Sequence, residues 1–101
     1  MRRVLTAPAV AAAPGVRGDR AYALDPRVAL RPEPFGALAY HCGNRRLTFL
    51  RAPELVALVK DLEHHRTVDD ALAASSIAAS RWSAFRAALS ALVESEVIRE
   101  R

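Results

Sequence analysis

The spacing of apolar residues changes along this chain from the rhythm of strands to the rhythm of helices. Between Val28 and Leu50, short apolar stretches are separated by prolines and by Gly43-Asn44, a pattern typical of strands joined by tight turns. From Ala52 onward, apolar residues return every three to four positions, as they do in amphipathic helices. The pattern predicts an α+β fold in the order strand, strand, strand, helix, helix, helix.

The dipeptide Gly43-Asn44 predicts the register of the second and third strands. With glycine first, it suits a two-residue hairpin loop, and the facing pairs are then Cys42 with Arg45, Tyr40 with Leu47, and Leu38 with Phe49. One face of this hairpin is apolar (Leu38, Tyr40, Leu47, Phe49), and the other is mixed (Ala37, Ala39, His41, Arg46, Thr48, Leu50). We expect the apolar face to be buried against the helices.

Prolines distinguish the two outer strands of this sheet. Val28-Ala29-Leu30 can form the first strand, and we expect Pro32 and Pro34 to end it and to blunt its edge, because proline donates no ladder hydrogen bond. The third strand, Arg46 to Leu50, contains no proline. In a simple meander its outer edge is unpaired, and an unpaired edge can accept another extended chain.

Two helices are predicted directly after the sheet. The first begins at Ala52-Pro53-Glu54, where proline fits the first turn, and ends near Glu63. Its core stripe consists of Leu55, Leu58, Val59 and Leu62. The second runs from about Val68 to Ala74, with Thr67 and Asp70 resembling a capping box and with Val68, Ala71 and Leu72 on its buried side.

A third helix is predicted after a break at Ser75-Ser76. Ser80 can cap it, although it can also begin earlier, near Ile77, and its apolar spacing lasts to about Glu94. Trp82 and Phe85 at its start fit a core role, and they can also line a groove whose other wall is the third strand. The apolar pair Val97-Ile98 can pack back on the fold.

Composition bounds the class of protein. The chain has 101 residues, a net charge of +4 and one cysteine, which fits one domain in a reducing, cytoplasmic compartment without a disulfide framework. No stretch is long and apolar enough for a membrane span. Arg2-Arg3 and the alanines that follow loosely imitate a signal peptide, but Pro8 interrupts the apolar part. We therefore interpret residues 1–20 as a disordered Ala/Pro-rich tail and residues 21–101 as the folded domain.

The sequence offers no argument for catalysis. His41 and Cys42 are adjacent in a strand, so their side chains point to opposite faces and cannot chelate one ion. The other histidines, His64-His65, diverge on a helix, and no zinc pattern, phosphate-binding loop or nucleophile elbow is present. We predict no metal, no cofactor and no enzymatic activity.

Arginines near the third strand and the third helix leave two binding hypotheses open. Arg45, Arg46, Arg51, Arg81 and Arg86 fit ordinary surface charge, but some can contact a carboxylate-bearing partner along the strand edge. The last two helices also resemble a helix-turn-helix, which makes a winged-helix DNA-binding regulator the alternative. Because the third helix offers alanines rather than base-reading side chains, we do not expect nucleic acid.

One segment resembles a known family. The sequences LDPRVALRPEPFGALAYH, from Leu24 to His41, and RRLTFL, from Arg45 to Leu50, are similar to the peptide chaperones of mycofactocin biosynthesis. These belong to the precursor-peptide recognition elements, as does the peptide chaperone of pyrroloquinoline quinone biosynthesis. The resemblance covers residues 22–101. Related chains often carry a glycine near the end of the last helix, where this chain reads Glu94-Ser95-Glu96-Val97.

The resemblance implies a fold, a partner and a site. It implies a winged helix-turn-helix with a three-stranded antiparallel sheet and three helices, without catalytic activity. It implies that the leader of a ribosomally made precursor peptide adds as a strand and is presented to a radical SAM maturase. The expected peptide-binding residues are Arg46, Leu47, Thr48, Phe49, Leu50, Trp82, Phe85 and Arg86. An open edge can also pair with a second copy, so a homodimer remains an alternative.

Overall fold

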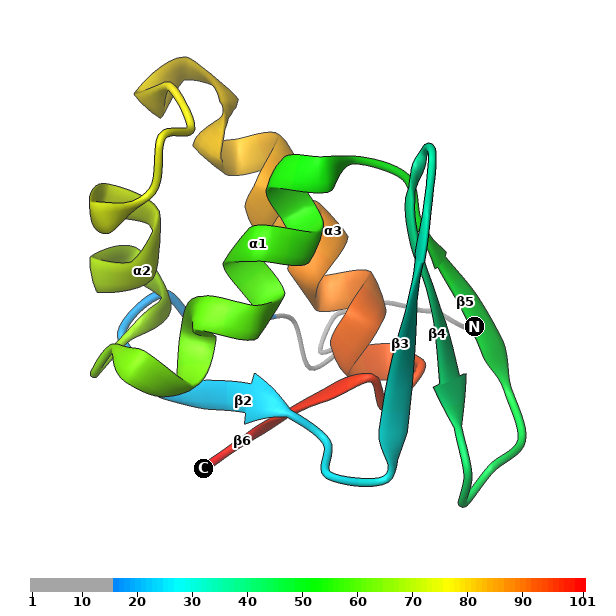
Figure 1. The fold of residues 1–101 in the computed structure, drawn as a ribbon. Coiled ribbons are helices and arrows are strands. Elements are labelled where there is room, and N and C mark those ends of the chain that lie inside the picture. Colours follow the sequence, from blue (N-terminus) through cyan, green and yellow to red (C-terminus); the bar gives the residue numbers. More distant parts are fainter. Residues whose placement is uncertain (1–15) are drawn as a thin grey trace, which may run out of the picture.

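The computed structural model describes residues 16–101. It contains a three-stranded sheet, a two-stranded sheet and three α-helices (Figure 1). The elements are β2 (Tyr22–Leu24), β3 (Val28–Glu33), β4 (Gly36–His41), β5 (Leu47–Leu50), α1 (Pro53–Asp61), the 3₁₀ turn η1 (Leu62–His64), α2 (Val68–Ala74), the 3₁₀ turn η2 (Ala79–Arg81), α3 (Trp82–Glu94) and β6 (Ile98–Glu100). The predicted α+β class is confirmed. The tail prediction for residues 1–15 falls outside the described residues.

Strands β3, β4 and β5 form an antiparallel meander in that order. The predicted pairs Tyr40 with Leu47 and Leu38 with Phe49 are confirmed. The first strand, however, does not end before Pro32, which pairs with Ala37 inside β3. The bond from the Cys42 N–H to the Arg27 carbonyl, at 2.9 Å, sets the alternation along β3, and by that alternation the Pro32 nitrogen points to the open edge. Proline therefore costs no ladder hydrogen bond there.

The turn between β4 and β5 is longer than predicted. The His41 carbonyl accepts from the Arg45 N–H at 2.8 Å, and the His41 N–H donates to the Arg46 carbonyl at 3.0 Å, so residues 42–45 form a four-residue loop and Cys42 does not pair with Arg45. The reason is the buried imidazole of His41, whose Nδ1 accepts the N–H groups of Gly43 and Asn44 at 2.9 and 3.0 Å. Because both N–H groups are bonded to the ring, the chain does not form a two-residue hairpin turn here.

The prediction of which hairpin face is buried is wrong. Ala37, Ala39, His41 and Leu50 face the helices and are buried, whereas Tyr40, Leu47 and Phe49 are exposed and Leu38 is half-buried. Helix α1 lies against β4 (Figure 1). The short side chains of Ala37 and Ala39 let it approach closely, so leucines from the helices fill most of the core together with Leu50 from β5.

The helical half follows the sequence pattern closely. Leu55, Leu58, Val59 and Leu62 are buried, and Thr67 caps α2 by accepting from the Asp70 N–H at 3.0 Å. The bounds of α2 and the end of α3 at Glu94 are as predicted. Ser80 is not the cap, because it lies inside η2 and α3 begins at Trp82 with no side-chain cap.

The small sheet of β2 and β6 is not anticipated by the sequence pattern. β2 pairs antiparallel with β6, with Leu24 opposite Ile98, and Val97 and Ile98 are buried as expected. Residues 16–20 also lie on the fold, because Val68 and Asp69 at the start of α2 donate N–H bonds to the carbonyls of Arg20 and Gly18, at 3.1 and 3.0 Å. The small sheet joins the beginning and the end of the described chain beneath the helices (Figure 1).

Candidate functional site

The outer edge of β5 is an unpaired strand edge within residues 16–101. The bond between the His41 N–H and the Arg46 carbonyl fixes its alternation. The backbone groups of Thr48 and Leu50 therefore face β4, while the N–H and C=O groups of Leu47 and Phe49 point away from the sheet. The edge presents two donors and two acceptors to an incoming strand.

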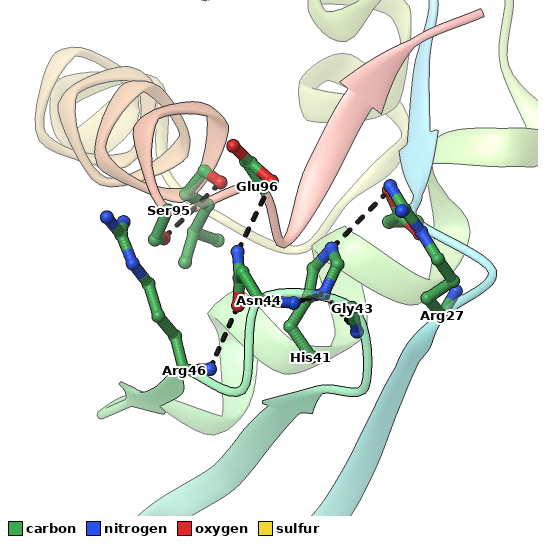
Figure 2. Close-up of polar contacts among 9 residues, drawn as sticks. Arg27, His41, Gly43, Asn44, Arg46, Ser95 and Glu96 are labelled. Atoms are coloured by element: carbon green, nitrogen blue, oxygen red, sulfur yellow. Dashed lines mark hydrogen bonds and ion pairs between the residues drawn. The ribbon is translucent and has the colours of Figure 1, made fainter.

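Both ends of this edge are held in place. At the start of β5, the Asn44 side chain accepts from the Arg46 N–H at 2.9 Å and donates to the Glu96 carboxylate at 3.3 Å (Figure 2). Glu96 follows the end of α3, so this contact ties the hairpin loop to that helix. At the other end, β5 leads through Arg51 and Ala52 directly into α1. The strand is therefore positioned relative to α1 and α3 before any ligand arrives.

A groove of about 220 Å³ lies between the end of β5 and α3. It is lined by Arg51, Ala52, Leu55, Arg81, Ala84, Phe85 and Ala88. Phe85 is buried, and Ala84 and Ala88 have short side chains on the open side of α3. The groove is therefore mainly apolar with two arginines, and the small alanines leave room for another backbone to approach the helix.

The two arginines of the groove have different partners. Arg81 donates to the Glu54 carboxylate at 3.1 Å, and its guanidinium lies 5.0 Å from the centre of the Phe85 ring. The backbone N–H of Glu54 and then Arg81 hold the pKa of the Glu54 carboxyl below its usual value. Arg51 stacks on Phe49, 5.1 Å from the ring centre, and has no carboxylate partner among residues 16–101. Arg51 is thus the uncommitted cation of the groove.

The structure brings some of the predicted site residues together and separates others. Leu47 and Phe49 are exposed on β5, Thr48 is half-buried and Leu50 is fully buried, while Arg46 is exposed just before the strand. Phe85 reaches the groove. Trp82 and Arg86 instead face the α2 side of α3, where Trp82 donates Nε1–H to the Ile77 carbonyl at 2.9 Å and Arg86 donates to Asp69 at 2.8 Å.

Sequence reasoning missed the small residues of the groove. Ala84 and Ala88 were not among the expected site residues, although Ala84, Ala88 and Ala91 stand at i, i+4 and i+7 and therefore share one helix face. An alanine face beside the predicted Phe85 is the signal that could have identified this wall.

A polar cluster that the sequence pattern does not indicate lies beside the β4–β5 loop, with Asp25 and His41 buried and Arg27 exposed. Asp25 accepts from Arg27 through the backbone N–H at 2.8 Å and through the side-chain Nε–H and Nη2–H at 3.1 Å each. The Arg27 side-chain and backbone bonds lower the pKa of the Asp25 carboxyl to about 2. His41 lies alongside Arg27 (Figure 2), with its Nε2 3.7 Å from the Asp25 carboxylate. Because Nδ1 accepts two N–H groups, the ring proton sits on Nε2.

Other features of residues 16–101 suggest no chemistry. No group of three potential metal ligands comes together in this part of the chain, and Cys42 is exposed while His41 is buried. Two larger hollows, one of about 490 Å³ beside α1 and Ile77 and one of about 550 Å³ beside Leu24, Val28 and Lys60, are not lined by any residue of β5. None of the described helices is long and apolar enough to cross a membrane.

Comparisons with known proteins agree on one family. The model of the peptide chaperone MftB family matches residues 21–99. A peptide chaperone MftB of Mycobacterium ulcerans is 41% identical over 97% of this chain and 94% of its own length. A peptide chaperone MftB of Mycolicibacterium smegmatis is 40% identical over 79% of this chain and 78% of its own length. No solved structure gives a significant match. The chain therefore belongs to the MftB family, the peptide chaperones of mycofactocin biosynthesis.

Proposed function

We propose that this chaperone binds the leader of a ribosomally made precursor peptide as a strand added to β5, and that it presents the peptide to a radical SAM maturase. The observation that carries the proposal is the unpaired edge of β5, which stands beside an apolar groove at the start of α3. An extended peptide adds to an open sheet edge through main-chain hydrogen bonds. The chaperone itself is not an enzyme.

Backbone bonds at the edge would supply the affinity. The outward N–H and C=O groups of Leu47 and Phe49 form two bonding positions about 7 Å apart, the two-residue repeat of a strand. Thr48 and Leu50 hold β5 against β4 and keep these groups in line. Arg46, exposed where β5 begins, lies near one end of the added strand and can meet a carboxylate there.

Side chains in the groove would supply the specificity. Alternate residues of an added strand point to the inner side of the sheet, where Phe85, Ala84 and Ala88 offer an apolar wall. Apolar leader residues fit this wall. Trp82 and Arg86 support the site indirectly, since their bonds to Ile77 and Asp69 hold the start of α3 on the α2 side.

We also propose that the fold is a winged helix-turn-helix whose third helix does not present a DNA-binding surface. In this interpretation α2 and α3 are the helix pair and the β4–β5 hairpin is the wing. The face of α3 that would read a DNA groove carries Ala84, Ala88 and Ala91, which present no hydrogen-bonding groups to base edges. This face favours a close-packed peptide over a nucleic acid.

The test is a titration of the ¹⁵N-labelled chain with the leader of the precursor peptide from the same biosynthetic system. We expect the largest amide shifts in residues 46–50 and in residues 81–88, with β3 nearly unmoved as the internal reference. Shifts concentrated in β3 or in the N-terminal residues, with residues 46–50 unmoved, would contradict strand addition at β5.

A further inference from the structure

The face of the three-stranded sheet that points away from the helices carries an exposed apolar patch. We call it the outer face, and its large side chains are Phe35 (38% exposed), Tyr40 (39%), Leu47 (61%) and Phe49 (51%), together with half-buried Leu38. Helices α1 and α3 lie on the other side of the sheet (Figure 1). Contiguous exposed aromatic side chains on a small domain mark an interaction site more often than a chance exposure.

The aromatic side chains of the outer face are organised as a contact surface. The rings of Phe35 and Phe49 lie 5.8 Å apart at a tilted angle, which joins the β3–β4 turn to β5 across the sheet. Arg51 stacks over Phe49, so its charge lies at the rim rather than over the centre. Rigid aromatic side chains and stacked arginines are the residue types that dominate protein–protein interfaces.

The charges around the outer face indicate what kind of surface it fits. By the register of β3, Arg31 and Glu33 stand on this face, and they neutralise each other in a 2.7 Å ion pair. Arg51 remains without a carboxylate partner in the described part of the chain, which leaves the rim net positive. A second copy would bring one basic rim against another, whereas a partner with carboxylates around an apolar centre is complementary.

The outer face adjoins the proposed leader site and shares Leu47 and Phe49 with it, using their side chains rather than their backbone groups. Leu47 and Phe49 project onto the outer face, while their backbone groups point along the sheet to the open edge. A leader strand added at β5 would therefore extend this face by its own alternate side chains. A protein that docks here would touch the chaperone and the bound leader together.

We propose that the outer face is the docking surface for the maturation enzyme, which would offer an apolar patch with carboxylates at its rim. This proposal rests on the proposed function, because it takes the leader to occupy the β5 edge and leave the outer face free. Binding of enzyme and leader is then simultaneous, and the enzyme distinguishes the loaded chaperone from the empty one by the extra strand.

The test uses the full-length chain, the purified maturase and the leader peptide in separate binding titrations. Tyr40→Ser removes the exposed ring on the middle strand β4, and Phe35→Ser in the turn is a second variant; neither residue belongs to the leader site. We expect each to weaken maturase binding about tenfold or more, as truncation of a central interface aromatic does, with leader binding unchanged. Tyr40→Phe keeps the ring and should bind the maturase as the wild type does. Association with the maturase should slow as salt is added.

The alternatives give distinct results. Unchanged maturase binding by folded Tyr40→Ser and Phe35→Ser would overturn the proposal, as would loss of leader binding by these variants. A wild-type dimer that Tyr40→Ser converts to monomer in sedimentation would assign the outer face to a second copy instead. Failure of the wild-type chain to bind leader at β5 would count against the proposed function alone, because maturase binding is measured independently.

Discussion

The His41 N–H donates to the Arg46 carbonyl at 3.0 Å, and this one bond sets the direction of every backbone group in β5. Since bonding positions alternate along an antiparallel pair, Thr48 and Leu50 are turned to β4, and Leu47 and Phe49 are turned to the open edge. The same alternation, counted on β3 from Arg27 and Cys42, turns the Pro32 nitrogen to the opposite open edge. The open edge of β3 therefore lacks a hydrogen-bond donor at Pro32, while the open edge of β5 keeps all its donors.

This alternation predicts different effects of proline at neighbouring positions. Phe49→Pro removes an outward N–H, so we expect the chain to stay folded and leader binding to weaken about tenfold, the effect of losing about one hydrogen bond of 1.4 kcal/mol. Thr48→Pro removes a ladder bond to β4 and should destabilise the hairpin itself. Calorimetric titration and thermal unfolding measure the two effects. Phe49→Ala, which keeps the N–H, is the control, and equal leader affinity of Phe49→Pro and Phe49→Ala would contradict an edge-bound peptide.

Side-chain burial predicts that adjacent residues of β5 contribute unequally to stability. Leu50 is fully buried among the core residues, whereas Phe49 lies half in solvent. We expect Leu50→Ala to lower the free energy of unfolding by about 2–5 kcal/mol through a cavity. Phe49→Ala should lower it by about 1 kcal/mol or less, through lost contacts with Phe35 and Arg51. Urea unfolding measures both values, and a larger loss for Phe49→Ala would show that the outer face is covered in solution.

The low pKa of Asp25 predicts a window of acid sensitivity. The pKa is about 2 in the folded chain and close to 3.9 for an unfolded aspartate. On acidification the unfolded state therefore binds the proton first, so the contribution of the Asp25 carboxylate is complete above about pH 4 and is lost by about pH 2. Unfolding of the wild type and of Asp25→Asn between pH 5 and pH 2 measures the contribution of the Asp25 carboxylate to stability. Their difference in stability should shrink as the pH falls through the window. A difference that does not change between pH 5 and pH 2 would mean that Asp25 is not held by Arg27.

The left-handed residue at the end of α3 predicts unequal stabilities for two substitutions at Glu96. Glu96 has φ of 64°, and the bonds Glu96 N–H to Val93 C=O and Val97 N–H to Leu92 C=O form a Schellman motif. A residue other than glycine in this left-handed conformation costs about 1 kcal/mol. Glu96→Gly should therefore be about 1 kcal/mol more stable than Glu96→Ala, since both lose the contact with Asn44 and only glycine removes the strain. Thermal unfolding of the pair decides, and equal stabilities would argue against the left-handed position.

The amino-acid pattern by itself determined the elements whose signals are local. The stripe from Leu55 to Leu62, the cap formed by Thr67 and the end of α3 at Glu94 depend on neighbours within one or two helical turns, and each is found as predicted. The register that places Tyr40 opposite Leu47 is also local, because the strands are consecutive and the chain between them is short. The open edge of β5 follows from that order and from the absence of proline.

The tertiary structure decided the features that depend on packing between elements distant in sequence. An alternating strand shows two faces, but only the approach of α1 to Ala37 and Ala39 chose the small-residue face for the core and left Phe49 outside. The pairing of β2 with β6 joins residues 74 to 78 positions apart, beyond any local pattern. The roles of Phe85 and Arg86 diverged for the same reason: they are adjacent in sequence, and a turn of about 100° per residue sends one to the groove and the other to Asp69.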